Sequence, residues 1–186
     1  MDQLLCLPCV SDIRDFLGKL PEDLERAYDE IMNQINSQKG RSPEIARRAF
    51  LWVMCSCRPL PCGMLADAVS RDPETGAANP TGLDINAVLE ACRNLLMIDR
   101  SGVCRFSHLS VQEYLEAHHY SNGQAHLVVG SVCLRVLLDP TNWQSIKSLP
   151  SSIYDGLNRE EDIIPYIVAY WPHQSGSMHR KALMVA

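Results

Sequence analysis

Motifs that mark common enzyme active sites are missing from this chain of 186 residues. It contains no Gly-x-x-x-x-Gly-Lys-Ser/Thr segment, the loop whose backbone amides hold nucleotide phosphates. No apolar run ends in the paired acidic residues that would hold the magnesium ion of an NTPase. Neither a Gly-x-Ser-x-Gly nor a His-Glu-x-x-His motif is present. We therefore interpret the chain as non-enzymatic.

Long apolar runs and an excess of basic residues are absent too. No stretch approaches the roughly 18 apolar residues that a membrane-spanning helix needs. The first ten residues are apolar, but Asp2 stands where a secretory signal requires positive charge. The formal net charge of -5 argues against non-specific binding to nucleic acid or to an anionic membrane. We expect a cytoplasmic protein that binds neither.

The eight cysteines form no clear disulfide or metal pattern. Most lie in periodic apolar segments, where cysteine behaves as a small hydrophobic residue, so we expect buried free thiols there. These are Cys55, Cys57, Cys92, Cys104 and Cys133. Cys6 and Cys9 have the Cys-x-x-Cys spacing of redox and zinc sites, but no second pair of ligands follows. A role for this pair stays open as the lesser alternative, and we expect no metal site elsewhere.

The most informative stretch is Val103–His118, which reads as a short strand that turns directly into a helix. Apolar and polar residues alternate up to position 107, and the spacing becomes helical from position 111. Ser110 and Glu113 fit a capping box and predict Ser110 as the N-cap. His108 then lies just ahead of a helix N-terminus, where free amides and the helix dipole favour an anion.

Apolar periodicity also predicts helices over 20–35, from 42 to a stop at 58–59, and over 60–69, 84–96, 124–138 and 160–170. The first helix should bury one stripe: Leu24, Ala27, Tyr28, Ile31 and Ile35. Ser42 and Pro43 look like the N-cap and first residue of the second helix. Residues 97–106 read as two strands joined by a turn at 100–102, and the loop over 72–82 should be the most mobile segment.

Three segments resemble a known family. Phe106-Ser-His-Leu-Ser-Val-Gln-Glu-Tyr-Leu115 is similar to the strand-to-helix signature of the winged helix in NACHT-type (STAND) signalling NTPases. The run from Leu20 to Ile31 resembles the end of their helical domain. Tyr166 to His173 resembles an element that follows the winged helix in fungal members, before ankyrin or similar repeats. The implied fold is mainly α: a winged helix-turn-helix with a β-hairpin wing over 41–121, the end of a helical domain over 1–40, and a helical segment over 122–186.

The resemblance implies a regulatory function. In that family the histidine at the position of His108 touches the phosphate of bound ADP and helps to keep the protein closed, while Ser110, Gln112 and Glu113 would position the helix. ADP or ATP would be bound only by an upstream nucleotide-binding domain, so no cofactor is expected in this chain itself. The implied partners are that ATPase domain, in cis or in trans, a downstream repeat domain, and further copies of the full-length protein.

Two other functions stay in view. The first is a stand-alone protein-interaction adaptor that binds the ATPase domain of another protein. DNA binding by the winged helix is the weaker alternative, because helix 84–96 carries Asp84 and Glu90 against Arg93 alone, and phosphate contacts need a basic face.

The remaining polar and aromatic candidates have simpler interpretations. Arg105 should form a surface ion pair. His118 and His119 point to different faces of a helix and are poorly placed to share a metal ion. Tyr166, Tyr170 and Trp171 should pack in the core.

Overall fold

The computed structural model describes residues 22–149 and 162–170. The segment predicted as a short helix at 1–19, the Cys6–Cys9 pair and Trp171 lie outside these ranges. The elements run in the order α2 (Glu22–Asn36), α3 (Ser42–Cys55), β1 (Leu60–Pro61), α4 (Cys62–Ser70), α5 (Ile85–Ala91), β2 (Leu96–Ile98), β3 (Val103–Phe106), α6 (Leu109–His118), α7 (Asn122–Leu138), the 3-10 turn η2 (Pro140–Asn142) and α8 (Trp143–Lys147). A last helix spans 164–170.

Strands from the middle of the sequence form a small antiparallel sheet with the order β1-β3-β2. The predicted hairpin is confirmed, with Leu96 opposite Phe106 in the register of β2 and β3. The helix predicted over 60–69 begins two residues late, because Leu60 pairs with Cys104 and adds a third strand. A mainly α chain with a small three-stranded sheet confirms the predicted fold class.

The turn between β2 and β3 is built around one carboxylate. Asp99 Oδ1 accepts the backbone N–H groups of Ser101 at 2.8 Å and Val103 at 3.2 Å. Gly102 has a φ of +77°, which a glycine adopts without steric cost. These bonds close the wing tightly and start β3 in register.

Two predicted details of the first helices are wrong. On α2 the buried side chains are Tyr28, Met32 and Ile35, whereas Ala27 is exposed, because the buried face follows the 28–32–35 spacing. On α3 the N-cap position belongs to Arg41, which makes no side-chain capping bond, and the predicted cap Ser42 is already helical.

Helix α5 is shorter than predicted, and its ends have clear causes. Asp84 caps it by accepting the N–H of Asn86 at 3.1 Å. It ends at Ala91 because Arg93 and Asn94 adopt positive φ values of 49° and 64°, which turn the chain into β2. The would-be recognition helix of the winged helix therefore has only seven residues.

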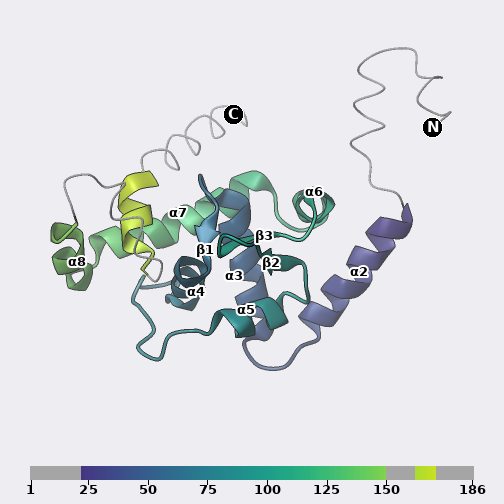
Figure 1. Cartoon of the computed structure of the whole chain (residues 1–186), viewed down its shortest axis with the longest axis horizontal. Coiled ribbons are helices and arrows are strands. Elements are labelled where there is room, and N and C mark those ends of the chain that lie inside the picture. Colours follow the sequence, from purple (N-terminus) through teal and green to yellow (C-terminus); the bar gives the residue numbers. More distant parts are fainter. Residues whose placement is uncertain (1–21, 150–161, 171–186) are drawn as a thin grey trace, which may run out of the picture.

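One apolar core joins the described elements, and the two ends of the molecule differ (Figure 1). Helices α2 and α6 lie toward one end, and α7, α8 and helix 164–170 lie toward the other. The predicted core role of Tyr166 is confirmed, since it is 3% exposed and its hydroxyl accepts the N–H of Cys57 at 2.7 Å. Its ring lies 4.9 Å from that of Tyr170, between centroids. None of the described helices is long and apolar enough to cross a bilayer.

The loop over 72–82 is attached to α7 rather than standing clear of it. Gly76 is buried, with a φ of +77°, and a Cβ there would lie 2.8 Å from the backbone nitrogen of Val136. Arg71 donates to the carbonyl of Gly76 at 3.2 Å, and Arg135 donates to that of Pro73. These anchors hold the first half of the loop against the helix.

Candidate functional site

His108 forms the junction between β3 and α6. Its backbone is extended (φ -150°, ψ 153°), and its Nδ1 accepts the backbone N–H of Ser110 at 3.2 Å, so the imidazole itself is the N-cap of α6. The prediction of Ser110 as the N-cap in a capping box with Glu113 is wrong. The helix starts earlier than predicted, at Leu109, and the histidine ring performs the capping that the serine hydroxyl was expected to perform.

Ser110 has a different role, as a buried link to α2. It is 5% exposed, and its hydroxyl lies 2.7 Å from His108 Nδ1 and 2.7 Å from the hydroxyl of Tyr28. The three polar groups connect helix α2, the first turn of α6 and the candidate histidine. Sequence reasoning placed Tyr28 on the buried stripe of α2 but gave no indication of this partner.

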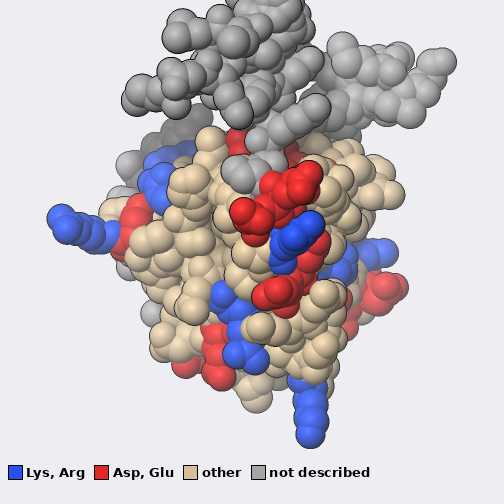
Figure 2. All heavy atoms as spheres, turned by 90° about the vertical axis from the view of Figure 1, so that its right-hand side faces the viewer, with Lys and Arg blue, Asp and Glu red and all other residues tan. Residues whose placement is uncertain are grey.

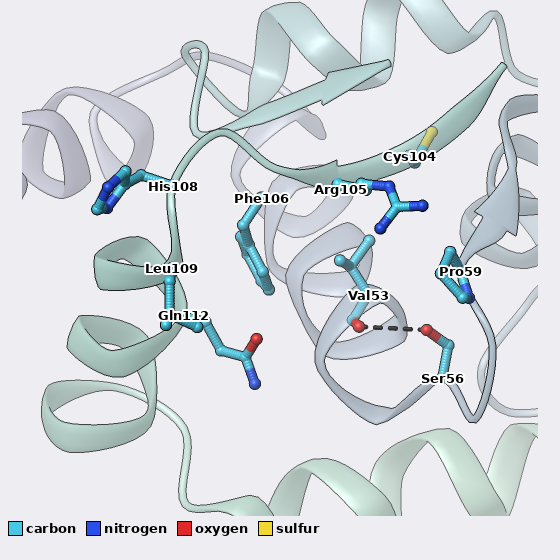
Figure 3. A pocket seen from close by; sticks show the side chains of 9 residues that line it. All are labelled: Val53, Ser56, Pro59, Cys104, Arg105, Phe106, His108, Leu109 and Gln112. Carbon is cyan, nitrogen blue, oxygen red and sulfur yellow. Dashed lines mark hydrogen bonds between the residues drawn. The ribbon is translucent and has the colours of Figure 1, made fainter. Parts of the chain in front are cut away.

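The geometry leaves one ring nitrogen of His108 facing outward. Because Nδ1 accepts a backbone N–H, the neutral ring carries its proton on Nε2. The residue is exposed, and in Figure 3 its ring points away from Arg105 and Gln112, on the other side of the chain that joins β3 to α6. Within the described part of the chain, no hydrogen bond engages Nε2. The site therefore presents a fixed N–H donor to whatever lies beside it.

A hollow of about 270 Å³ lies at the same junction. Residues of α3, the segment after α3, β3 and the start of α6 border it, with the His108 ring pointing away from it: Val53, Ser56, Pro59, Cys104, Arg105, Phe106, His108, Leu109 and Gln112 (Figure 3). Its volume is at the small end of the roughly 300–1,000 Å³ typical of ligand pockets. Leu109, next to His108, leaves 65% of its surface exposed. The junction thus presents apolar surface beside the exposed donor.

The other predicted positioning residues lie on the outer side of α6. Gln112 lines the hollow and donates to Glu116 at 2.8 Å. Glu113 is exposed and does not cap the helix. Gln112 and His108 both border the hollow, but the His108 ring points away from Gln112, and Glu113 stands apart from the hollow.

The predicted surface ion pair of Arg105 is confirmed. Its guanidinium lies 2.6 Å from Asp99 Oδ2, and 54% of its side chain is exposed. Hydrogen bonds from Ser101 and from Arg105 hold the pKa of Asp99 well below its usual range. This pair reinforces the wing turn.

The two histidines at the end of α6 join the same interface with α2. His118 Nε2 lies 3.4 Å from a carboxylate oxygen of Glu25. His119 Nε2 lies 2.9 Å from the hydroxyl of Tyr114, which donates in turn to Asp29 at 2.6 Å. Burial, followed by the charge of His118, lowers the pKa of His119. Among the residues that the structure describes, no group of three histidine, cysteine or acidic side chains could hold a metal ion.

The cysteines that the structure describes form no disulfide with one another. Cys55, Cys92, Cys104 and Cys133 are buried as expected, whereas Cys57 is exposed. Burial raises the pKa of Cys104 and of Cys133 to about 12. Since the thiolate is the reactive form, these side chains act as core packing rather than as nucleophiles.

The end of the molecule that carries α2 has a mixed charge. The first turn of α2 supplies Glu22, Asp23 and Glu25. Figure 2 faces this end and shows acidic side chains with basic ones scattered among them, and no continuous basic surface. A surface of this kind lacks the positive stripe that follows a nucleic-acid backbone.

The order of elements from α3 to β3, helix–strand–helix–helix–strand–strand, defines a winged helix-turn-helix domain, and α6 follows directly from the wing. Such a domain is a helical module that is non-catalytic in itself. The family described as "GPI inositol-deacylase, winged helix domain" matches residues 30–125. The chain belongs to this winged-helix family.

A fungal relative extends the match beyond the winged helix. The chain is 28% identical over 181 residues to the azaphilone pigments biosynthesis cluster protein L of Monascus ruber. The match takes in 85% of this chain and 36% of the relative, so the chain spans about a third of the length of that protein. No solved structure matches the chain.

Proposed function

We propose that this chain is the regulatory winged-helix portion of a NACHT-type STAND signalling NTPase, which stabilises the closed, ADP-bound state. Three observations support the proposal: membership of a winged-helix family, a fungal relative almost three times as long as the matched part, and the Phe106–Leu115 signature at the junction of β3 and α6. ADP would be bound by an upstream nucleotide-binding domain, and opening would be relayed to oligomerisation.

The observation that carries the proposal is the outward N–H of His108. Its Nδ1 is fixed by the cap of α6, so Nε2 can donate to a phosphate oxygen held by a neighbouring domain. A hydrogen bond to a charged group is worth about 1.5–3 kcal/mol. If the contact exists only in the closed state, it shifts the closed-to-open equilibrium by roughly ten- to a hundredfold.

The test uses the full-length NTPase that contains this chain, with His108→Asn compared with His108→Ala. Asparagine is a good N-cap residue and retains the capping of α6, but it lacks the imidazole donor. Both variants should release ADP about tenfold faster and self-associate more readily, because both lose the phosphate contact. Alanine should also destabilise the domain by about 1 kcal/mol through loss of the cap.

Unchanged ADP retention in the asparagine variant would remove His108 from the mechanism. A result in which alanine alone has an effect would show that His108 acts as a cap and not as a nucleotide sensor. The adaptor function is tested separately, by adding this chain to a P-loop-bearing relative and measuring the ADP affinity of that relative. Tighter ADP binding in the mixture would support action in trans.

DNA binding is disfavoured as the alternative. The exposed side chains on and beside the short helix α5 include Asp84 and Glu90, with Arg93 as the basic group. Recognition helices need basic or amide side chains that project into the groove. Labelled duplex should show no salt-dependent retention by this chain.

A further inference from the structure

Helix α2 reaches the candidate histidine through two hydroxyl groups. The Tyr28 hydroxyl lies 2.7 Å from Ser110 Oγ, which lies 2.7 Å from His108 Nδ1. Tyr28 and Ser110 are both buried, at 8% and 5% exposure, while His108 is exposed at the outer end of the series. The connection therefore runs from the protein interior to the surface.

The direction of the bonds follows from counting protons. The backbone N–H of Ser110 can only donate, so His108 Nδ1 must be the unprotonated ring nitrogen. The Ser110 hydroxyl then donates its single proton to Nδ1, and its oxygen accepts the phenolic proton of Tyr28. Every proton in the series points toward the ring, and Nε2 carries the remaining imidazole proton.

We propose that Tyr28 and Ser110 are positioning residues for His108: docking of α2 on α6 reinforces the tautomer that presents Nε2–H to the neighbouring domain. This inference rests on the proposed function and makes His108 depend on the position of α2. If α2 moves away from α6, Ser110 loses the donor that orients its hydroxyl, and the ring retains the backbone cap but loses the shorter of the two bonds that hold its tautomer. The readiness of the histidine to hold a phosphate then depends on where α2 lies.

The same interface offers a matched control. Tyr114 lies next to Tyr28, with ring centroids 5.2 Å apart, and its hydroxyl also bonds a side chain across the interface, that of Asp29 at 2.6 Å. No bond connects Tyr114 with Ser110 or His108 among the described residues. Tyr28→Phe and Tyr114→Phe therefore each remove one hydroxyl from the α2–α6 interface, but Tyr28→Phe alone affects the series that ends at His108.

The first experiment measures the tautomer of His108 directly, by nitrogen NMR of labelled imidazoles in this chain. It is done at about pH 8, where an ordinary imidazole is neutral. Wild type should show His108 as a single tautomer with bare Nδ1 and protonated Nε2. Tyr28→Phe and Ser110→Ala should both increase the population with protonated Nδ1, with the larger change for Ser110→Ala. Tyr114→Phe should leave the His108 signals in place.

A protonated Nδ1 in wild type would overturn the inference. So would a change in Tyr28→Phe no larger than the change in Tyr114→Phe, since a general loosening of the interface would affect both variants alike. Ser110→Ala provides a second variant if Tyr28→Phe folds poorly.

The second experiment measures ADP release from the full-length NTPase. Tyr28→Phe should accelerate release about two- to tenfold, the equivalent of one neutral hydrogen bond, and Tyr114→Phe should not. In the background of His108→Asn, Tyr28→Phe should have no further effect on release. A further acceleration in that background contradicts the coupling. If His108→Asn alone leaves release unchanged while the NMR result holds, the proposed function fails and the positioning role of Tyr28 stands.

Discussion

Helix α7 packs on the central helix α3, and α2 packs on α6 toward one end of the molecule, but different forces hold the two interfaces together (Figure 1). Leu51 and Trp52 of α3 are buried, as are Val129 and Val132 of α7, and all four border one cavity of only about 20 Å³. At the α2–α6 interface, Tyr28 and its neighbours make side-chain hydrogen bonds, and a hollow of about 270 Å³ adjoins the start of α6.

The two interfaces should therefore respond differently to pH and to a bound ligand. Apolar burial is non-directional and insensitive to pH, so the α3–α7 interface should open only with the fold as a whole. Hydrogen bonds have a modest net value, about 0.5–1.5 kcal/mol each, and depend on geometry and on protonation. The interface that holds His108 is therefore the one that can respond to a ligand or to a neighbouring domain.

The largest expected effect tests the apolar interface. Trp52 is 3% exposed, and Trp52→Ala should lower the free energy of unfolding by about 3–5 kcal/mol through loss of burial and creation of a cavity. Trp143 on α8 is 51% exposed, and Trp143→Ala should change stability by about 1 kcal/mol or less. Urea unfolding followed by circular dichroism measures both. Equal effects at the two positions would contradict the importance given to the α3–α7 interface.

A smaller loss of stability is expected from the buried Arg71, which pairs with Asp67 and with Asp162, just before helix 164–170. The Arg71 guanidinium lies 2.9 Å from Asp67 and 3.6 Å from Asp162, with its side chain 4% exposed. Arg71→Met should cost about 3 kcal/mol, because Asp67 is left without its cation. Arg105→Met is the control: its pair with Asp99 is exposed and should be worth about 1 kcal/mol or less. Similar costs for the two variants would show that burial does not decide the strength of these pairs.

Local patterns predicted the helices and the wing well. The helix over 124–138 followed from its apolar spacing, and the structure has α7 at Asn122–Leu138. The turn at 100–102 followed from Ser101 and Gly102, and the strands on either side pair as expected. These features depend on residues close together in the chain, which is why the sequence alone reveals them.

Features that depend on distant partners were missed. Strand β1 has two residues, one of them a proline, and exists because Leu60 meets Cys104 in β3. The bond between Tyr28 and Ser110 joins residues 82 positions apart. The close approach of Gly76 to the backbone of α7, which places the first half of the 72–82 loop against that helix, was not part of the prediction. No periodicity within one segment carries such information.

At the candidate site, too, a contact with a distant residue decides a detail that the local sequence pattern does not reveal. The motif placed His108 at the junction of strand and helix, and the structure has it there. The capping box assigned the wrong capping residue, since a serine followed by a glutamate three positions later is a common helix start. Which side chain caps the helix was decided by the burial of Ser110 against Tyr28, which a local pattern does not contain.

The smallest expected effect is a pH dependence confined to the α2–α6 interface. Burial, followed by the charge of His118, lowers the pKa of His119, so the folded state binds this proton less readily than the unfolded state. Stability is therefore lost as the pH falls through the unfolded value of about 6.5 toward the folded one, and it is retained above that range. The protection factors of the α6 amides, which take account of the slower intrinsic exchange at lower pH, should fall between about pH 7.5 and pH 5.5, while those of the α7 amides should not.

A control is needed because the neighbouring groups act in opposite directions. Asp29, which accepts from Tyr114, raises the pKa of His119, against the burial and the charge of His118 that lower it. His119→Gln retains a side-chain donor for the Tyr114 hydroxyl but does not titrate, so it should remove the acid-induced loosening and leave the His118–Glu25 pair unchanged. If α6 in this variant still loosens on acidification as it does in wild type, the pH dependence belongs to another group.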